Sequence, residues 1–354
     1  MARALRTGRR GTGLRILITG ATGLVGGEVA ARLVARGHAV TALVHRAADI
    51  RGNGGASVAV ERLTGDVTLP GFGIAAPPPF DLILHSAAIT AFDAAPERYR
   101  AVNIGGVANA VALAEAAGTP LLHVSTAYVC GTRDGVVRET ETGDDFVNGY
   151  EASKAAGEAL VGTAMARGLV AAIARPSIIV GEWATGRIRD FSNIYMIFRL
   201  IAEGRVRTLP AAPGASLDLV PIDHVCGGIV AMAEDMARVA GRTLHLTAAT
   251  PTPLPALGAA IAAVPGLGAP HFVAPEAFAP AALPAVERRY HAAAAALYTS
   301  YLLRGPRFDT LGATALLPPC PPTDRAWLDR LINYCLDAGF VTSRPDKGRP
   351  ALSA

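Results

Sequence analysis

The chain has 354 residues, of which 51% are hydrophobic and 18% are charged, a balance that describes a well-packed globular protein and excludes a disordered one. Its net charge of +4 is matched by Arg3, Arg6, Arg9 and Arg10, so the rest of the chain is formally neutral and a nucleic-acid-binding face is not expected. No apolar run reaches the roughly 18 residues of a membrane span, and the four scattered cysteines lack metal-ligand spacing, which favours free thiols, no metal and a cytoplasmic location.

The first part of the chain predicts a parallel sheet. Residues 1–13 lack the apolar core of a signal peptide and are expected to form a disordered basic tail. From residue 14, apolar runs alternate with alanine-rich segments of helical spacing. The expected strands, in chain order, are LRILITG, HAVTALVHR, part of SVAVERLTGDV, PFDLILHSAA, PLLHVSTAYVCG and LVAAIARPSIIVG. This alternation predicts right-handed crossovers and an α/β fold of the Rossmann type, a doubly wound parallel sheet.

Helices are expected between these strands. LVGGEVAARLVARG should end at Gly37, NIGGVANAVALAEAAG should begin at Asn103, and FVNGYEASKAAGEAL should open a third helix. After Gly181 the alternation weakens and the chain becomes rich in proline and alanine. The last helix is expected from about Asp324 to Ala338, with Thr323 as its N-cap and Gly339 as its terminator.

These patterns predict a core and a smaller lobe. We expect an NADP-binding Rossmann core over residues 14–182 and a mainly helical C-terminal substrate lobe over 183–340. Within that lobe, residues 217–248 should return to the core, because they contain the strand-like TLHLTAA. Residues 341–354 should form a flexible tail. The segment 191–204, FSNIYMIFRLIAEG, either lines an apolar substrate channel or is a core helix of the lobe.

A glycine-rich turn marks the expected cofactor site. LITGATGLVGG places Gly20, Gly23 and Gly26 directly after a strand and at the start of a helix. Glycines allow a pyrophosphate to approach the backbone, and the N–H groups at a helix N-terminus face it. The second strand ends with His45 and Arg46, where an NAD-preferring site carries a carboxylate. Arg46 either binds the 2′-phosphate of NADP(H), which is the predicted cofactor, or is a solvated residue at a strand end.

Other residues at the ends of strands complete this predicted site. Asp66 follows the third strand, where it either meets the adenine edge or forms a turn after glycine. Pro176 follows the sixth strand and should shape the backbone beside the nicotinamide. The full predicted cofactor-binding set is Thr19, Gly20, Thr22, Gly23, Leu24, Val25, Gly26, His45, Arg46, Asp66, Val67, Ser86, Ala87, Ala88, Tyr150, Lys154, Pro176, Ser177 and Ile178.

The predicted chemistry depends on Tyr150 and Lys154. Four residues apart on a helix, the two side chains share one face, although most pairs with this spacing are surface residues. A phenol with its usual pKa near 10 is a poor proton donor at neutral pH. A nearby ammonium, together with the positive nicotinamide ring, should lower that pKa. Lysine suits this position because its compact ammonium can also bind a ribose hydroxyl.

Two further polar residues are predicted to act with this pair. Thr126, at the end of the fifth strand, could hydrogen-bond a substrate carbonyl oxygen and hold it for hydride attack. Asn103, at the start of the preceding helix, either anchors a water that connects to Lys154 or caps the helix.

In this order, TGATGLVG, LILHSAA, Asn103, Thr126, Tyr150 and Lys154 resemble the extended short-chain dehydrogenases/reductases. HVSTAYVCG, FVNGYEASKAAGEALV, RPSIIVGEWATG and LVPIDHV are most similar to the thioester-reductase and fatty-acyl-reductase (male-sterility-type) branch. The resemblance implies NADPH-dependent reduction of an acyl thioester, on coenzyme A or a carrier protein, to an aldehyde and sometimes to the alcohol. It also implies that Thr126, Tyr150 and Lys154 form the catalytic triad.

Other functions remain open from the sequence. One alternative is a carbonyl reductase or hydroxysteroid-type dehydrogenase that acts on a free small molecule. A sugar-nucleotide epimerase or dehydratase shares the tyrosine and lysine, but it usually carries a carboxylate in place of Arg46. A non-catalytic NADP sensor is the third alternative, and the intact Tyr150 and Lys154 argue against it. The expected partners are a small-molecule or thioester substrate and a carrier protein in trans, with the enzyme a monomer or homodimer.

Overall fold

The computed structural model describes residues 13–46 and 48–343, so the predictions for residues 1–12 and 344–354 lie outside it. Its central sheet has seven strands in the order β12-β7-β5-β4-β1-β2-β3, and every neighbouring pair is parallel. This confirms the predicted doubly wound α/β fold. The strands are β1 (Arg15–Thr19), β2 (Ala39–Val44), β3 (Glu61–Thr64), β4 (Leu82–His85), β5 (Leu121–Val124), β7 (Ala171–Pro176) and β12 (Thr243–Leu246).

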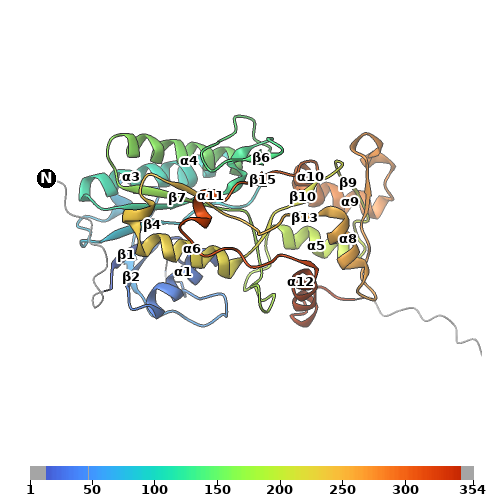
Figure 1. Ribbon diagram of the computed structural model, residues 1–354, viewed down its shortest axis with the longest axis horizontal. Helices are drawn as coiled ribbons and strands as arrows, with labels where there is room; N and C mark the ends of the chain where they lie inside the picture. The colour runs from blue at the N-terminus through green and yellow to red at the C-terminus, as the bar shows by residue number, and fades with distance from the viewer. Residues whose placement is uncertain (1–12, 47, 344–354) are drawn as a thin grey trace, which may run out of the picture.

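Helices cover both faces of this sheet (Figure 1). Successive side chains of a strand point to opposite faces, and β1 shows the result: Ile16 and Ile18 join one buried apolar cluster, and Leu17 joins another. The first cluster packs under α1 (Leu24–Ala35) and α6 (Ile222–Glu234), and the second under α3 (Gly106–Ala117) and α4 (Gly149–Ala166). Because both faces are covered, the inner strands read as continuous apolar runs in the sequence, whereas the edge strand β3 (ERLT) is largely exposed.

The segment before α3 differs from the prediction. A single helical turn, α2 (Pro96–Arg98), leads into the π-helical segment η2 (Tyr99–Gly105), and α3 follows without a break. The expected helix start at Asn103 was therefore wrong, because the helical path begins at Pro96, a residue suited to the first turn. Asn103 lies inside the π-helical segment and does not cap a helix.

Two predicted strands are shorter than expected. The fifth ends at Val124, and its continuation forms a 3-10 turn, η3 (Ala127–Cys130). The sixth is divided at Ser177 into β7 and β8 (Ile178–Val180). The strand β8 leaves the central sheet and pairs with β11 (Leu219–Pro221). Both changes place polar residues at the carboxyl end of the sheet, where ligands bind in doubly wound folds.

The smaller lobe lies beyond this end of the sheet (Figure 1). Its helices are α5 (Ile194–Ala202), α8 (Leu254–Ala262), α9 (Ala285–Ala293), α10 (Thr299–Leu302) and α12 (Arg325–Asp337). The domain boundaries stay a prediction; α6 and β12, inside residues 217–248, are part of the core. The remaining short elements are η1 (Pro70–Gly73), β6 (Val136–Val137), β9 (Thr208–Pro210), β10 (Ser216–Leu217), α7 (Met236–Val239), β13 (Thr252–Pro253), β14 (His271–Val273), η4 (Pro275–Ala277), η5 (Pro280–Ala282), η6 (Ala295–Tyr298), β15 (Arg307–Phe308) and α11 (Leu311–Thr314).

The last helix, α12, has a different cap from the one predicted. Asp324 is the N-cap and accepts the N–H of Trp327 at 3.0 Å. Thr323 is wrong as the cap because its hydroxyl donates to the Thr250 carbonyl at 2.8 Å. At the other end, Gly339 follows the C-cap with a φ of 66°, the left-handed conformation that favours glycine, which agrees with its predicted role as terminator.

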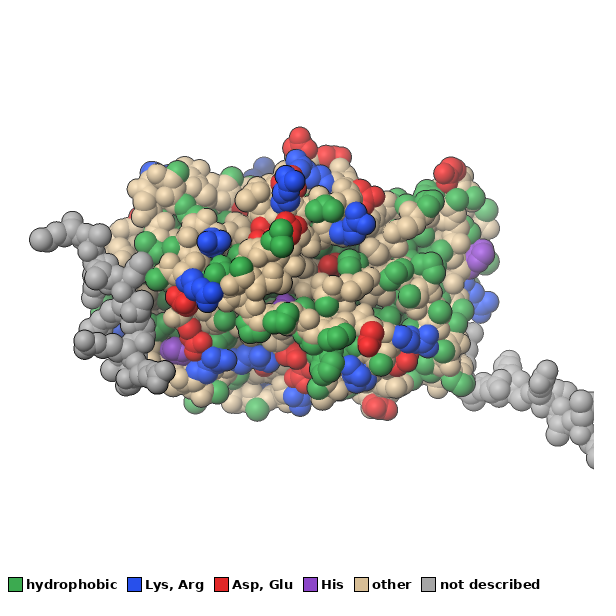
Figure 2. All heavy atoms as spheres, viewed as in Figure 1, with side chains coloured by type: hydrophobic (Ala, Val, Ile, Leu, Met, Phe, Trp, Pro, Cys, Tyr) green, Lys and Arg blue, Asp and Glu red, His purple; other side chains and the backbone are tan. Residues whose placement is uncertain are grey.

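The surface charges, the helix lengths and the positions of metal-ligating side chains do not indicate a further function. In the view of Figure 2, basic and acidic side chains are interleaved rather than gathered into one field. Over residues 13–46 and 48–343, no helix combines the length and apolarity needed to cross a bilayer. The same residues contain no cluster of three or more His, Cys, Asp or Glu side chains suited to a metal ion.

Candidate active site

The glycine-rich turn joins β1 to α1. A Cβ on Gly20, whose φ is +73°, would lie 2.6 Å from the backbone nitrogen of Ala87, and one on Gly26 would lie 2.2 Å from the Gly20 carbonyl oxygen. These two glycines let the turn pack against the end of β4 and against itself. A Cβ on Gly23 would meet a single described neighbour, the Gly20 oxygen at 3.3 Å, so this glycine faces open space.

The N-terminus of α1 suits an anion. Its first residue follows Gly23, the helix has no side-chain cap among the described residues, and its first turn has no acidic residue. Uncapped N–H groups at a helix N-terminus attract negative charge. The open side of Gly23 and this uncapped terminus therefore fit the pyrophosphate of a dinucleotide.

Thr19, predicted to bind the cofactor, is completely buried. Its hydroxyl lies 2.9 Å from His85 Nδ1 and accepts the N–H groups of Ser86 and Ala87, each at 3.2 Å. The Thr19 side chain thus ties β1 to the loop after β4 and positions the predicted Ser86–Ala88 segment. Thr22, by contrast, is exposed in the turn.

The end of β2 carries the residues expected to choose between NAD and NADP. His45 and Arg46 are both exposed, and His45 Nδ1 lies 3.4 Å from Asp66 Oδ2. Asp66 Oδ1 also accepts the N–H and the hydroxyl of Thr68, both at 2.8 Å. These hydrogen bonds hold the pKa of Asp66 below its usual value and show that Asp66 forms a turn. Among the described residues, Arg46 has no hydrogen bond or ion pair.

The helix α4 presents Tyr150 and Lys154 at the carboxyl end of β5. Asn148 caps this helix by accepting the N–H of Glu151 at 2.9 Å. Lys154 lies one helical turn after Tyr150 and is buried, and its Nζ donates to the Val124 carbonyl at 2.6 Å. Burial lowers the pKa of Lys154 to about 8, although the Glu158 charge acts in the opposite direction. The lysine is therefore fixed beside the last residue of β5.

Tyr150 is less acidic in the structure than the sequence suggested. Burial raises the pKa of Tyr150 to about 12, a hydrogen bond with Thr126 lowers it, and the charge of Glu151 and the nearby Tyr99 raise it. Lys154, whose Nζ is held at the Val124 carbonyl, is not among these causes, and the predicted lowering by Lys154 together with the nicotinamide ring stays a prediction. The predicted neighbourhood of Thr126 and Tyr150 is nevertheless present.

Asn103 connects three elements instead of capping one. Its Oδ1 accepts the N–H of Ile89 at 2.7 Å, and its Nδ2 donates to the Ile89 carbonyl at 3.0 Å and to Ser153 Oγ at 2.8 Å. These bonds join η2 to the loop after β4 and to the residue before Lys154. The predicted role of Asn103 as a water anchor for Lys154 stays a prediction.

The residues after β7 are held by a buried carboxylate. Pro176 is the last residue of β7 and Ile178 is the first of β8. Between them, the Ser177 hydroxyl donates to Asp218 Oδ1, which also accepts the N–H of Ala248 at 2.8 Å. Burial raises the pKa of Asp218 to about 6. Asp218 was not predicted from the sequence, because it lies 41 residues from Ser177 in the chain and no local pattern links the two.

Aromatic rings from the segment after β4 and from the lobe lie beside Tyr150. The ring of Phe92 lies 6.0 Å from that of Tyr150, and it contacts Tyr298 and Tyr301 at 5.5 and 5.4 Å. Tyr301 also holds a buried carboxylate, because its hydroxyl donates to Glu151 Oε1 at 2.7 Å. Spacing in the sequence gave no signal for this contact, because its two residues are 150 positions apart.

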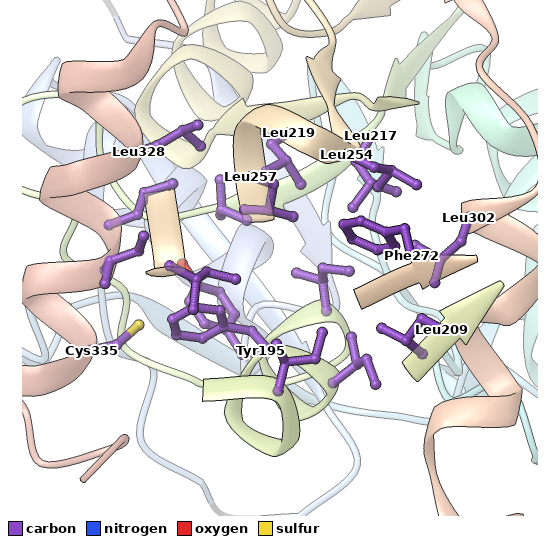
Figure 3. Close-up of a pocket in the computed structure, with 18 residues that line it drawn as sticks. Tyr195, Leu209, Leu217, Leu219, Leu254, Leu257, Phe272, Leu302, Leu328 and Cys335 are labelled. Carbon is purple, nitrogen blue, oxygen red and sulfur yellow. The ribbon is translucent and has the colours of Figure 1, made fainter. Parts of the chain in front are cut away.

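The lobe also encloses an apolar cavity with about 700 Å³ of empty space, its opening included. Figure 3 shows its walls, which come from α5, α8, α12 and the short strands of the lobe. Five residues of α5 line it: Ile194, Tyr195, Ile197, Phe198 and Ile201. The predicted segment 191–204 thus forms part of the buried core of the lobe and also lines a cavity.

With this geometry in place, comparison with known proteins identifies the family. An NAD-binding family model described as "Male sterility protein" matches residues 18–229, which is more than half of the chain. The chain belongs to this family. The membership confirms the resemblance that the motifs indicated, and it supports a nicotinamide cofactor.

Curated relatives match parts of this family member. It is 36% identical over 156 residues to a dTDP-4-dehydrorhamnose reductase of Mycolicibacterium smegmatis, covering 42% of this chain and 41% of that protein. It is 33% identical over 216 residues to sterol demethylase protein B of Methylococcus capsulatus, covering 59% and 62%. It is 27% identical over 182 residues to the nonribosomal peptide synthetase asaC of Aspergillus flavus, covering 48% and 18%. The chain therefore spans less than two thirds of each relative.

Solved structures share the fold of this family member over nearly its whole length. The terminal R domain of the myxalamid PKS-NRPS pathway has a TM-score of 0.78 and 24% identity, with 95% of this chain and 94% of that chain covered. The thiolation-reductase di-domain of an archaeal non-ribosomal peptide synthetase has a TM-score of 0.66 and 17% identity, with 93% and 91% covered. A UDP-glucuronic acid 4-epimerase of Bacillus cereus, in complex with NAD, has a TM-score of 0.66 and 17% identity, with 92% of this chain and 99% of that chain covered.

Proposed function

We propose that this protein is an NADPH-dependent reductase that converts an acyl thioester, carried by coenzyme A or a carrier protein, to an aldehyde. The observation that carries the proposal is the meeting of Thr126, Tyr150 and Lys154 at the carboxyl end of the sheet, in a member of the male sterility family. The likeness to terminal reductase domains supports the thioester over a free carbonyl compound. An acyl or peptidyl carrier protein and a cytoplasmic location belong to this proposal.

The proposed mechanism assigns a separate task to each side chain. When bound, NADPH supplies the hydride. The hydroxyls of Thr126 and Tyr150 hold the carbonyl oxygen of the thioester, and Tyr150 donates its proton to that oxygen as negative charge develops there. Lys154, which lies one helical turn from Tyr150 and is fixed at the Val124 carbonyl, supplies a positive charge to the site. The tetrahedral product then releases the thiol and leaves the aldehyde.

The first test measures NADPH consumption with acyl-CoA, acyl-pantetheine, aldehyde and ketone substrates. Tyr150→Phe should reduce turnover of the accepted substrate about 100-fold or more, because a positioned general acid contributes at least that factor. Tyr290→Phe is the matched control, since Tyr290 lies on α9 and contacts Arg205 in the lobe. Undiminished turnover in Tyr150→Phe would overturn the mechanism. Activity on free ketones with none on thioesters would replace the proposed substrate by that of a carbonyl reductase.

The preference for NADPH depends on Arg46. Its exposed guanidinium at the end of β2 is available for a 2′-phosphate. Arg46→Asp should lower kcat/KM with NADPH about 10- to 100-fold and leave or improve the value with NADH, since it removes one charge-assisted contact and repels the phosphate. Arg36→Asp is the control, because Arg36 follows the opposite end of α1 and pairs with Glu234. Equal losses with both cofactors would contradict this preference.

A further inference from the structure

Two buried opposite charges lie beside Tyr150. Glu151 follows the tyrosine in the first turn of α4, and its side chain is completely buried. Arg304 comes from the chain after α10 and is also buried. Its Nη2 donates to Glu151 Oε1 at 2.6 Å, across 153 positions of sequence. Among the ion pairs of the described residues, this pair and Arg175–Glu158 are the two that bury both side chains almost completely.

Residues of η3, the residue after it and the lobe make further contacts with this ion pair. The Arg304 guanidinium lies 5.1 Å from the ring of Tyr128 and 4.8 Å from that of Tyr301, and its Nη1 donates to the Gly131 carbonyl. The Tyr301 hydroxyl donates to the same Glu151 oxygen as Arg304 and accepts Asn148 Nδ2 at 3.3 Å. The N-cap of α4, the residue after Tyr150 and the lobe are therefore joined in one hydrogen-bonded group.

We infer that Glu151 and Arg304 are positioning residues for Tyr150: their ion pair fixes the first turn of α4 against the lobe and balances the charge beside the phenol. The inference rests on the proposed function, because it takes Tyr150 as the proton donor. The stacked rings of Phe92 and Tyr301, which lie 5.4 Å apart, extend the same contact to the ring of Tyr150. The hydrogen bonds of Glu151 and Arg304 among the described residues involve Asn148, Tyr301 and Gly131 and not the glycine-rich turn, so their effect on the cofactor site should be small.

The balance of charge follows from how the carboxylate is paired. Glu151 Oε1 accepts both hydrogen bonds, whereas Oε2 has no partner among the described residues. Besides burial, the negative charge of Glu151 raises the pKa of Tyr150. A positive guanidinium on the same carboxylate opposes that effect, because opposite charges within a few ångströms offset each other. Removing the Glu151 charge should therefore lower the pKa of Tyr150, and removing the Arg304 charge should raise it.

Other titratable groups lie near this pair or near Tyr150. Tyr301 comes from the lobe and Tyr128 and Cys130 come from η3, whereas Tyr99, from η2, faces Tyr150. Burial raises the pKa of Cys130 to about 11, with Arg304 acting against it and Glu151 adding to it. Burial also raises the pKa values of Tyr128 and Tyr301 above the usual phenol value. Because the pKa of Cys130 lies below that of Tyr150, the Cys130 thiol would ionise first. The titration is therefore carried out in a Cys130→Ala background, where Glu151 and Arg304 are the charges that a variant changes.

The test titrates Tyr150 directly, without a substrate. Protein labelled with ¹³C at the tyrosine Cζ positions is followed by NMR against pH with NADP⁺ added, and the Tyr150 signal is assigned by its loss in Tyr150→Phe. Glu151→Gln, which keeps the shape of the side chain, should lower the Tyr150 titration by about one pH unit. Arg304→Met should raise it by about as much, because it leaves the carboxylate charge unopposed. The double variant should return close to the wild-type titration.

The controls separate positioning from general damage. Arg167→Met removes an exposed ion pair with Glu115 at the other end of α4 and should leave the Tyr150 titration unchanged. Shifts in the same direction for both single variants, or no shift in folded Glu151→Gln, would overturn the inference. If Arg304→Met does not fold, Glu151→Gln decides alone, because its amide can still accept both hydrogen bonds. Since NMR needs no turnover, this result is independent of whether the thioester is the substrate.

Discussion

At the scale of single residues, the spacing of Tyr150 and Lys154 predicted their shared helix face but not their hydrogen bonds. Helical geometry fixes which side chains lie one turn apart, so the sequence could place both at one site. The Val124 carbonyl that holds Lys154 belongs to a strand 30 residues earlier, and no local pattern indicates it. For the same reason Asn103 was expected to cap a helix, whereas it bonds Ile89 and Ser153.

Lys154 should make stability depend on pH in a defined direction. Its pKa is lowered to about 8 in the folded protein, whereas an unfolded lysine keeps its proton up to about pH 10.4. Between these values the unfolded chain binds more protons, so the free energy of unfolding should rise with pH. Lys154→Met removes this contribution.

Urea unfolding of wild type and Lys154→Met at several values between pH 7 and 10 would measure this difference. The stability of the wild type relative to the variant should increase across that range, because the cost of burying the charged lysine disappears as it loses its proton. A difference that is constant with pH, or that falls as pH rises, would show that burial does not lower the pKa of Lys154.

At the scale of elements, α4 is held to the sheet by a second buried ion pair. Arg175 of β7 donates to Glu158 at 2.9 and 2.6 Å and to the carbonyls of Glu139 and Glu141 at 3.1 and 2.7 Å. The sequence predicted the helix and the strand from their apolar patterns. It could not predict this pair, because charges 17 residues apart on different elements follow no common period.

Breaking this pair should destabilise the core. Arg175→Met is expected to lower the free energy of unfolding by about 3–5 kcal/mol, since it leaves the Glu158 charge buried without a partner. The double variant Glu158→Gln with Arg175→Met should lose less, because no charge is then left unpaired. Thermal or urea unfolding measures both, with the exposed Arg167→Met as the control. A double variant less stable than Arg175→Met would contradict this account.

At the scale of the whole molecule, the core and the last helix of the lobe were predictable, and the short strands of the lobe were not. Buried parallel strands read as apolar runs separated by helices, and that alternation gave the doubly wound sheet. The lobe instead contains strands of only two or three residues. They pair with strands far away in the sequence, as β9 does with β14 and β10 with β13. Such short strands carry no alternation of their own, so packing rather than local pattern determines them.

The lobe should depend on Trp327 of α12. This side chain is completely buried within the apolar cluster of the lobe. Trp327→Ala should lower the free energy of unfolding by about 3–5 kcal/mol, through lost burial and the cavity left behind. The control is Trp183→Ala, since the other tryptophan of the chain is half-buried. Urea unfolding compares the two variants, and an equal loss would show that α12 does not anchor the lobe.

The contact between Arg304 and Glu151 also limits how this molecule can be recombined. A lobe exchanged with that of a relative carries its own residue into the place of Arg304, whereas Glu151 stays behind in the recipient. The chimera then buries an unpaired carboxylate next to Tyr150 unless Tyr301 and Arg304 are transferred with the lobe or Glu151 is neutralised in the same step. If Tyr150 is the proton donor that we propose, the lobe and the core can be exchanged only together with this ion pair.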